Sequence, residues 1–194
     1  MIKNSWVLAL CGLLQALLGL MHFLMIDHGS LISRLYRPNA LVTDMWIVAI
    51  AAGVCAIAAG IWRSKEVRVW LLVLNGLALI AYGLIPALWR GPLMLRPYFI
   101  LLLVTMAMSI GILALITTLN LQDHLPDRWF LGIAGVACVG FALVFLACDF
   151  RWIALEPNGL WLLNGSCFAL TAICLWRMAF RSNSLRVSNT LSTV

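Results

Sequence analysis

The chain has 194 residues, of which 64% are hydrophobic and only 10% are charged. Soluble domains carry about a quarter charged residues, so 13 Lys and Arg with 7 Asp and Glu are too few to cover the surface of a soluble domain. The composition therefore excludes a soluble protein and predicts an integral membrane protein surrounded by lipid. The net charge of +6 is spread singly along the chain, so no nucleic-acid partner is expected.

Six apolar stretches are long enough to cross about 30 Å of hydrocarbon, which takes around 20 helical residues each. Short segments rich in Pro, Gly and charge separate them. The sequence thus predicts a single all-α transmembrane domain of six helices, followed by a disordered tail over 182–194 that is rich in Ser, Thr and Asn. The predicted spans are 6–26, 44–62, 69–89, 98–119, 129–148 and 159–180.

Tryptophans and basic residues indicate how these spans lie in the membrane. Eight of the nine Trp residues fall near predicted span ends, as in the aromatic belt of membrane proteins. The termini and the second and fourth connections hold eight Lys and Arg, whereas the other three connections hold five. By the positive-inside rule, both termini are predicted to be cytoplasmic, in a bacterial inner membrane.

The first, third and fifth spans share the pattern W-x5-G-x6-(G/A). Its offsets of about 60 residues predict a two-helix hairpin used three times. Residues seven apart lie on nearly the same helix face, so these small residues are expected to be packing seams between helices. The second span carries a denser version at four-residue spacing. The predicted packing residues are Gly12, Gly19, Gly76, Gly83, Gly135, Ala52, Ala56 and Gly60.

This pattern resembles the HdeD-like family of small bacterial inner-membrane proteins, which are built from three helical hairpins. The matching segments run from Trp6 to Gly12, from Trp70 to Gly76 and from Trp129 to Gly135, and Arg63 and Arg177 close two of the hairpins. The first and third hairpin loops are longer and more polar than is usual in that family. The resemblance implies a link to acid or general stress response, and it implies no catalytic residue.

Four polar residues inside the spans are candidates for polar contacts or pH sensing: Gln15, His22, Asn75 and Asn164. For the two asparagines, hydrogen bonds between helices are expected. For His22, three interpretations are open: a packing residue with satisfied hydrogen bonds, a pH sensor, or a metal or haem ligand. The H-x5-H spacing from His22 to His28 fits no zinc motif, so no metal or cofactor is expected.

No catalytic motif is apparent, and the six cysteines form no C-x-x-C pair. The sequence therefore predicts a protein that is not an enzyme and that works by packing with lipid, with itself as a homo-oligomer, or with a membrane-protein partner. The alternatives are a small transporter or channel, which the repeat favours, and an accessory subunit of a larger membrane complex. An intramembrane enzyme is the least favoured interpretation.

Overall fold

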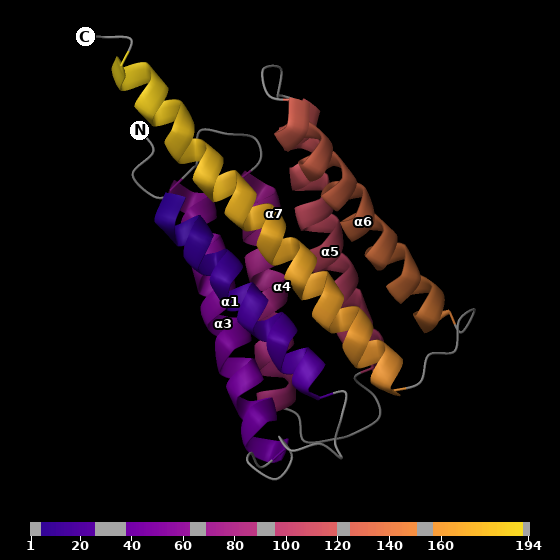
Figure 1. Ribbon diagram of the computed structural model, residues 1–194. Helices are drawn as coiled ribbons and strands as arrows, with labels where there is room; N and C mark the ends of the chain where they lie inside the picture. Colours follow the sequence, from indigo (N-terminus) through magenta and orange to yellow (C-terminus); the bar gives the residue numbers. More distant parts are fainter. Residues whose placement is uncertain are drawn as a thin grey trace.

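The computed structural model describes residues 5–25, 38–62, 69–88, 96–119, 125–150 and 157–191. These residues form six α-helices and no strand (Figure 1). The all-α prediction is therefore confirmed for the described part of the chain. The helices are α1 (Ser5–Leu24), α3 (Pro38–Trp62), α4 (Val69–Leu88), α5 (Arg96–Leu119), α6 (Leu125–Asp149) and α7 (Pro157–Leu191).

Proline marks the start of four of these helices. Pro38 and Pro157 are the first residues of α3 and α7, and a proline is the second residue of α5 and of α6. In the first turn a backbone N–H has no intrahelical acceptor, so proline loses nothing there and its fixed φ suits the helix. Pro38 in particular explains why α3 begins six residues before the predicted span 44–62.

The end of α7 differs from the sequence-based expectation. In place of a disordered tail from residue 182, the helix continues to Leu191. No Gly or Pro follows Gly165 in the sequence, so nothing in the backbone chemistry stops the helix after it leaves the apolar stretch. The polar composition of this segment was a poor guide to its backbone conformation.

Five helices are long and apolar enough to cross a membrane: α1, α5, α6, and the apolar parts of α3 and α7 over Asp44–Trp62 and Gly159–Phe180. The apolar stretch in α4, Trp70–Leu84, is shorter, although the helix itself has 20 residues. A 20-residue helix is about 30 Å long. The sixth crossing stays a prediction.

The helices form a closed ring in which each contacts the next along the chain and α7 contacts α1. In Figure 1, α7 crosses obliquely in front of the others and lies between α1, α3 and α4 on one side and α5 and α6 on the other. Its last turns project past the end of the bundle at which α1 begins. A further contact joins α5 and α7, so α7 has three neighbours.

Three pairs of glycines bring helix backbones together. A Cβ on Gly76 of α4 would lie 2.6 Å from the carbonyl oxygen of Gly53 in α3. Likewise, a Cβ on Gly135 of α6 would lie 3.0 Å from the carbonyl oxygen of Gly111 in α5. The third pair joins the two ends of the chain, because a Cβ on Gly19 of α1 would lie 2.9 Å from the Gly165 carbonyl in α7. A side chain at Gly76 or Gly19 would force the paired backbones apart, and one at Gly135 would require its neighbours to give by a few tenths of an ångström.

The other predicted packing residues also lie at helix contacts. A Cβ on Gly83 would lie 2.7 Å from the Trp46 carbonyl in α3, and one on Gly12 would lie 2.6 Å from the Trp176 ring in α7. Ala52, Ala56 and Gly60 of α3 are buried as well, and Gly60 lies seven residues from Gly53 on nearly the same face. The thiol of Cys11 in α1 reaches the Ala52 carbonyl at 3.5 Å, which places Ala52 toward α1.

The most extensive packing joins α3 with α4, α5 with α6, and α1 with α7. Each helix with the W-x5-G-x6-(G/A) pattern therefore packs mainly against the helix before it, and α1 packs against the last one. The predicted hairpins pair α1 with α3, α4 with α5, and α6 with α7, and these helices touch less extensively. The arrangement as three hairpins stays a prediction.

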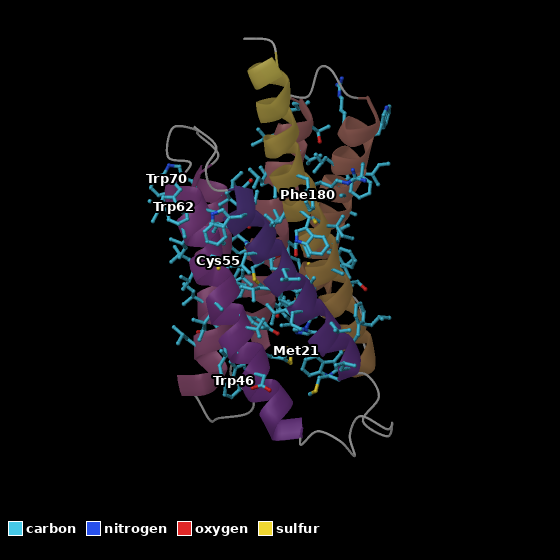
Figure 2. The ribbon with its side chains drawn as sticks, turned by 60° about the vertical axis from the view of Figure 1, so that its left-hand side comes forward. Met21, Trp46, Cys55, Trp62, Trp70 and Phe180 are labelled. Carbon is cyan, nitrogen blue, oxygen red and sulfur yellow. The ribbon has the colours of Figure 1, made fainter. Side chains whose placement is uncertain are left out.

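The outer surface of the bundle is apolar, and tryptophans gather toward one end of it. Trp62 and Trp70 lie together at one end and Trp46 at the other (Figure 2). Trp6 and Trp129 are also exposed, near the starts of α1 and α6. Trp89 and Trp152 lie outside the described residues. An apolar exterior with indoles at the helix ends is the surface that lipid and headgroups favour.

Candidate functional site

The four polar candidates do not meet at one site. Gln15, His22 and Asn75 are fully buried, whereas Asn164 is half-buried. Gln15 and His22 lie two turns apart on one face of α1, Asn75 lies in α4, and Asn164 lies in α7. Each therefore has its own surroundings.

His22 is held at both ring nitrogens. Its Nδ1 lies 2.7 Å from the Leu18 carbonyl oxygen, one turn earlier in α1. A carbonyl can only accept, so Nδ1 carries the hydrogen, and the Nε2 lone pair accepts from the Tyr82 hydroxyl of α4 at 2.9 Å. The neutral imidazole thus has both hydrogen bonds that it can make.

Aromatic rings enclose this histidine–tyrosine pair. The Phe168 and Trp161 rings of α7 have centroids 5.0 Å and 5.5 Å from that of His22, and Phe168 also meets Tyr82 edge-on at 5.9 Å. The pair therefore ties α1, α4 and α7 together in apolar surroundings. Among the described residues, no three His, Cys, Asp or Glu side chains are placed to hold a metal ion. This geometry is that of a packing histidine with satisfied hydrogen bonds.

The sequence contained both partners but not their pairing. Tyr82 is a polar residue inside a predicted span, 60 residues from His22. Its hydroxyl faces His22 because α1 and α4 present these residues to the same part of the interior. Periodicity along one helix indicates which face is buried, but it does not indicate which residues of two buried faces lie at the same height.

Gln15 has only a weak partner. Its Nε2 lies 3.8 Å from the sulfur of Cys11, and thiol sulfur is a poor acceptor. Cys11 in turn donates to the Ala52 carbonyl of α3. This short chain of contacts links α1 to α3 near the middle of the bundle.

A layer of buried polar residues divides the hydrophobic core in two. One cluster of buried apolar residues lies toward the end at which α1 begins, and a second cluster lies toward the other end. On each of four helices, one buried polar residue falls between the members of the two clusters. These residues, which we call the central polar layer, are Gln15 in α1, Asn75 in α4, Ser109 in α5 and Thr171 in α7.

The hydroxyls of the central polar layer are satisfied within their own helices. Ser109 donates to the Met106 carbonyl and Thr171 to the Phe168 carbonyl, both at 2.9 Å. Asn75 differs, because its Nδ2 atom is buried and has no hydrogen-bond partner in the described part of the chain. The Oδ1 atom of Asn164 is also buried and without a partner, but it lies outside the layer. Asn75 is thus the most conspicuous polar group in the interior.

Sequence reasoning missed half of each glycine pair. Gly53, Gly111 and Gly165 lie in helices that do not carry the tryptophan–glycine pattern, so no alignment of the repeated spans drew attention to them. The sequence-based prediction also assigned Trp176 to the aromatic belt. The Trp176 indole instead covers Gly12 and donates to the Ala9 carbonyl of α1 at 2.8 Å.

Comparison with known proteins adds no family to this description. No protein-family model matches the chain, and neither a curated protein nor a solved structure matches it significantly. The resemblance to the HdeD-like family therefore stays an expectation from the sequence. Any function has to be argued from the geometry of the described residues.

Proposed function

We propose that this chain is a small multi-pass membrane protein that works by associating with a second copy of itself in the bilayer. The outer face of α6 is the proposed contact. The proposal includes six crossings as three repeated hairpins, a bacterial inner membrane, and both termini in the cytoplasm. A role in acid or general stress response is part of it only through the resemblance to the HdeD-like family.

The single observation that carries the proposal is Gly140 of α6. A Cβ built there would meet no atom within 4 Å, so nothing inside the bundle requires a glycine at this position. Glycine in a helix interior costs about 0.5–1 kcal/mol relative to alanine. Small residues on lipid-facing surfaces are the device by which membrane helices approach each other closely.

The residues around Gly140 form a continuous apolar seam. Trp129, Ile133, Val136 and Leu143 are all exposed, and together with Gly140 they follow the alternating three- and four-residue spacing of left-handed helix pairs. Gly140 stands eleven residues after the tryptophan of its repeat, and the corresponding residues are Leu17 in α1 and Ala81 in α4. The glycine therefore distinguishes α6 from the two helices that share its pattern.

Corresponding positions of α1, α4 and α6 support the proposed repeat. Leu8, Leu72 and Leu131 follow the tryptophans by two residues, and all three are buried. Seven residues after each tryptophan stand Leu13, Leu77 and Val136, and all three are exposed. A repeated unit that buries one face against its neighbours is expected to show this agreement.

The course of α4 supports the sixth crossing. Two close contacts show that α4 is antiparallel to α3. Gly76 faces Gly53, and seven residues later in α4 Gly83 faces Trp46, which is seven residues earlier in α3. The length and direction of α4 therefore match a neighbour that is itself apolar enough to cross.

Measuring molecular mass in mild detergent and in native lipid nanodiscs tests the association. We expect the wild-type chain to be a dimer and Gly140→Leu to be a monomer with unchanged helicity. Ala81→Leu is the matched control, because it adds the same side chain at the corresponding position of α4 and should leave the dimer intact. A monomeric wild type, or a Gly140→Leu variant that still dimerises, would contradict the proposal.

A second candidate, a small transporter or channel, is favoured by the central polar layer. Substrate sites of many transporters lie near the middle of the membrane, between repeated units. Proteoliposomes that exchange glycerol faster than empty vesicles would support this candidate. An unchanged flux would remove it for that solute without affecting the mass measurement.

A further inference from the structure

The buried amide of Asn75 has no acceptor for its two hydrogens. Nδ2 lies in the interior, Asn75 itself is 1% exposed, and Nδ2 has no hydrogen-bond partner among the described residues. A buried donor without an acceptor destabilises a fold, and the more so where no bulk water reaches it. Buried amides of this kind therefore call for an acceptor that the chain itself does not supply.

The other members of the central polar layer leave acceptors and donors uncommitted. The Ser109 and Thr171 hydroxyls use their hydrogens on backbone carbonyls, so their oxygens keep lone pairs free to accept. The Gln15 amide has only a distant sulfur as partner. The layer can therefore both donate to and accept from a polar molecule placed within it.

Charge limits what such a molecule can be. The layer holds no Asp, Glu, Lys, Arg or His, and within the described apolar stretches the charged residues lie at or near the ends, as Asp44, Arg128, Asp149 and Arg177 do. An ion held among uncharged groups in the middle of an apolar bundle would remain uncompensated. An uncharged molecule would carry no such penalty.

We infer that the central polar layer binds a small uncharged molecule whose oxygen accepts a hydrogen bond from Asn75 Nδ2. Water and a small neutral solute with a carbonyl or hydroxyl oxygen share this chemistry. The site is distinct from the outer face of α6, so this inference can be correct or wrong whether or not the chain self-associates.

The sign of a stability change tests the inference. Asn75→Leu keeps the number and branching of the side-chain heavy atoms and removes the amide, although two methyl groups take more space than the oxygen and the NH2 group. If the amide were unpartnered, this change would raise the melting temperature of the purified protein, because it would replace a buried polar group by an apolar one. We expect the melting temperature to fall instead, by about 2–4 °C, because a real hydrogen bond is lost. A rise would overturn the inference.

Nuclear magnetic resonance then identifies the occupant and does not depend on any variant being stable. The side-chain NH2 signal of Asn75 in 15N-labelled protein is assigned by its disappearance in Asn75→Leu or Asn75→Ser. A cross-relaxation peak from this NH2 to water, at a residue this deeply buried, would identify water. A peak to added glycerol or acetamide would identify a solute site, and that solute should then raise the melting temperature of wild type more than that of Asn75→Leu. No peak to water or to either solute would overturn the inference.

Discussion

The contact between Gly53 and Gly76 gives the sharpest test of how this fold is held together. In Gly76→Ala, the new Cβ would lie 2.6 Å from the Gly53 carbonyl oxygen, which is 0.8 Å short of the 3.4 Å at which ordinary contacts begin. The obstacle is backbone, so α3 and α4 must move apart. Such overpacking costs about 1–3 kcal/mol, and the better helix propensity of alanine offsets about 0.5–1 kcal/mol of it.

We therefore expect Gly76→Ala to lower the free energy of unfolding by about 1 kcal/mol, which corresponds to about 2–4 °C in melting temperature. Gly132→Ala is the matched control, because its new Cβ would lie 3.4 Å from a Thr118 side-chain carbon, which is an ordinary contact, and it should be neutral or raise the melting temperature. Differential scanning fluorimetry in one detergent compares the two variants. If Gly76→Ala is as stable as Gly132→Ala, the carbonyl contact does not constrain the helices and the reasoning is wrong.

Three more predictions follow from individual contacts. Trp176→Phe removes the indole hydrogen bond to α1 and should cost about 0.5–1.5 kcal/mol of stability, whereas Trp70→Phe, at a site 77% exposed, should cost little in the same thermal assay. Tyr82→Phe removes the hydroxyl that donates to the buried His22 imidazole and should lower the free energy of unfolding by about 1–3 kcal/mol. Tyr98→Phe, at an exposed site, is the control, and equal melting temperatures of the two variants would refute the pairing. The predicted topology can be tested with two fusions. A fluorescent protein at the C-terminus should fluoresce, because that end is predicted to be cytoplasmic, and alkaline phosphatase fused after Gly91 should be active, because the third connection is predicted to lie on the opposite side. An inactive phosphatase at Gly91 would argue against α4 as a crossing.

The helices could be predicted from the sequence because lipid imposes a simple rule on length and polarity. Each described helix overlaps one predicted span, and the ends agree within a few residues where Pro or a charged residue interrupts the apolar stretch. The rule failed beyond Phe180, where α7 leaves the apolar stretch but meets no residue that breaks a helix. Apolar length reports the part of a helix within lipid, not the whole helix.

The interior was less accessible from the sequence. Spacing on one helix indicated Gly76 and Gly19 as candidate packing residues, but the residues they face, Gly53 and Gly165, depend on how antiparallel helices are registered. The central polar layer arises in the same way, because four residues far apart in sequence reach one height only after the helices pack. Asn75 was recognised as a polar residue inside a span, but only the assembled bundle shows that it is buried and that its amide lacks an acceptor among the described residues.

The seam between α1 and α7 has a consequence for how the chain is made. The hydrogen bond from Trp176 to the Ala9 carbonyl joins residues 167 positions apart. The pairs α3–α4 and α5–α6 can dock soon after each emerges from the ribosome, but the main partner of α1 is α7, which is synthesised only after the four helices between them. Until then His22 lacks the Trp161 and Phe168 rings that enclose it. A chain truncated before α7 would therefore leave this histidine without its cover, for cellular quality control to recognise.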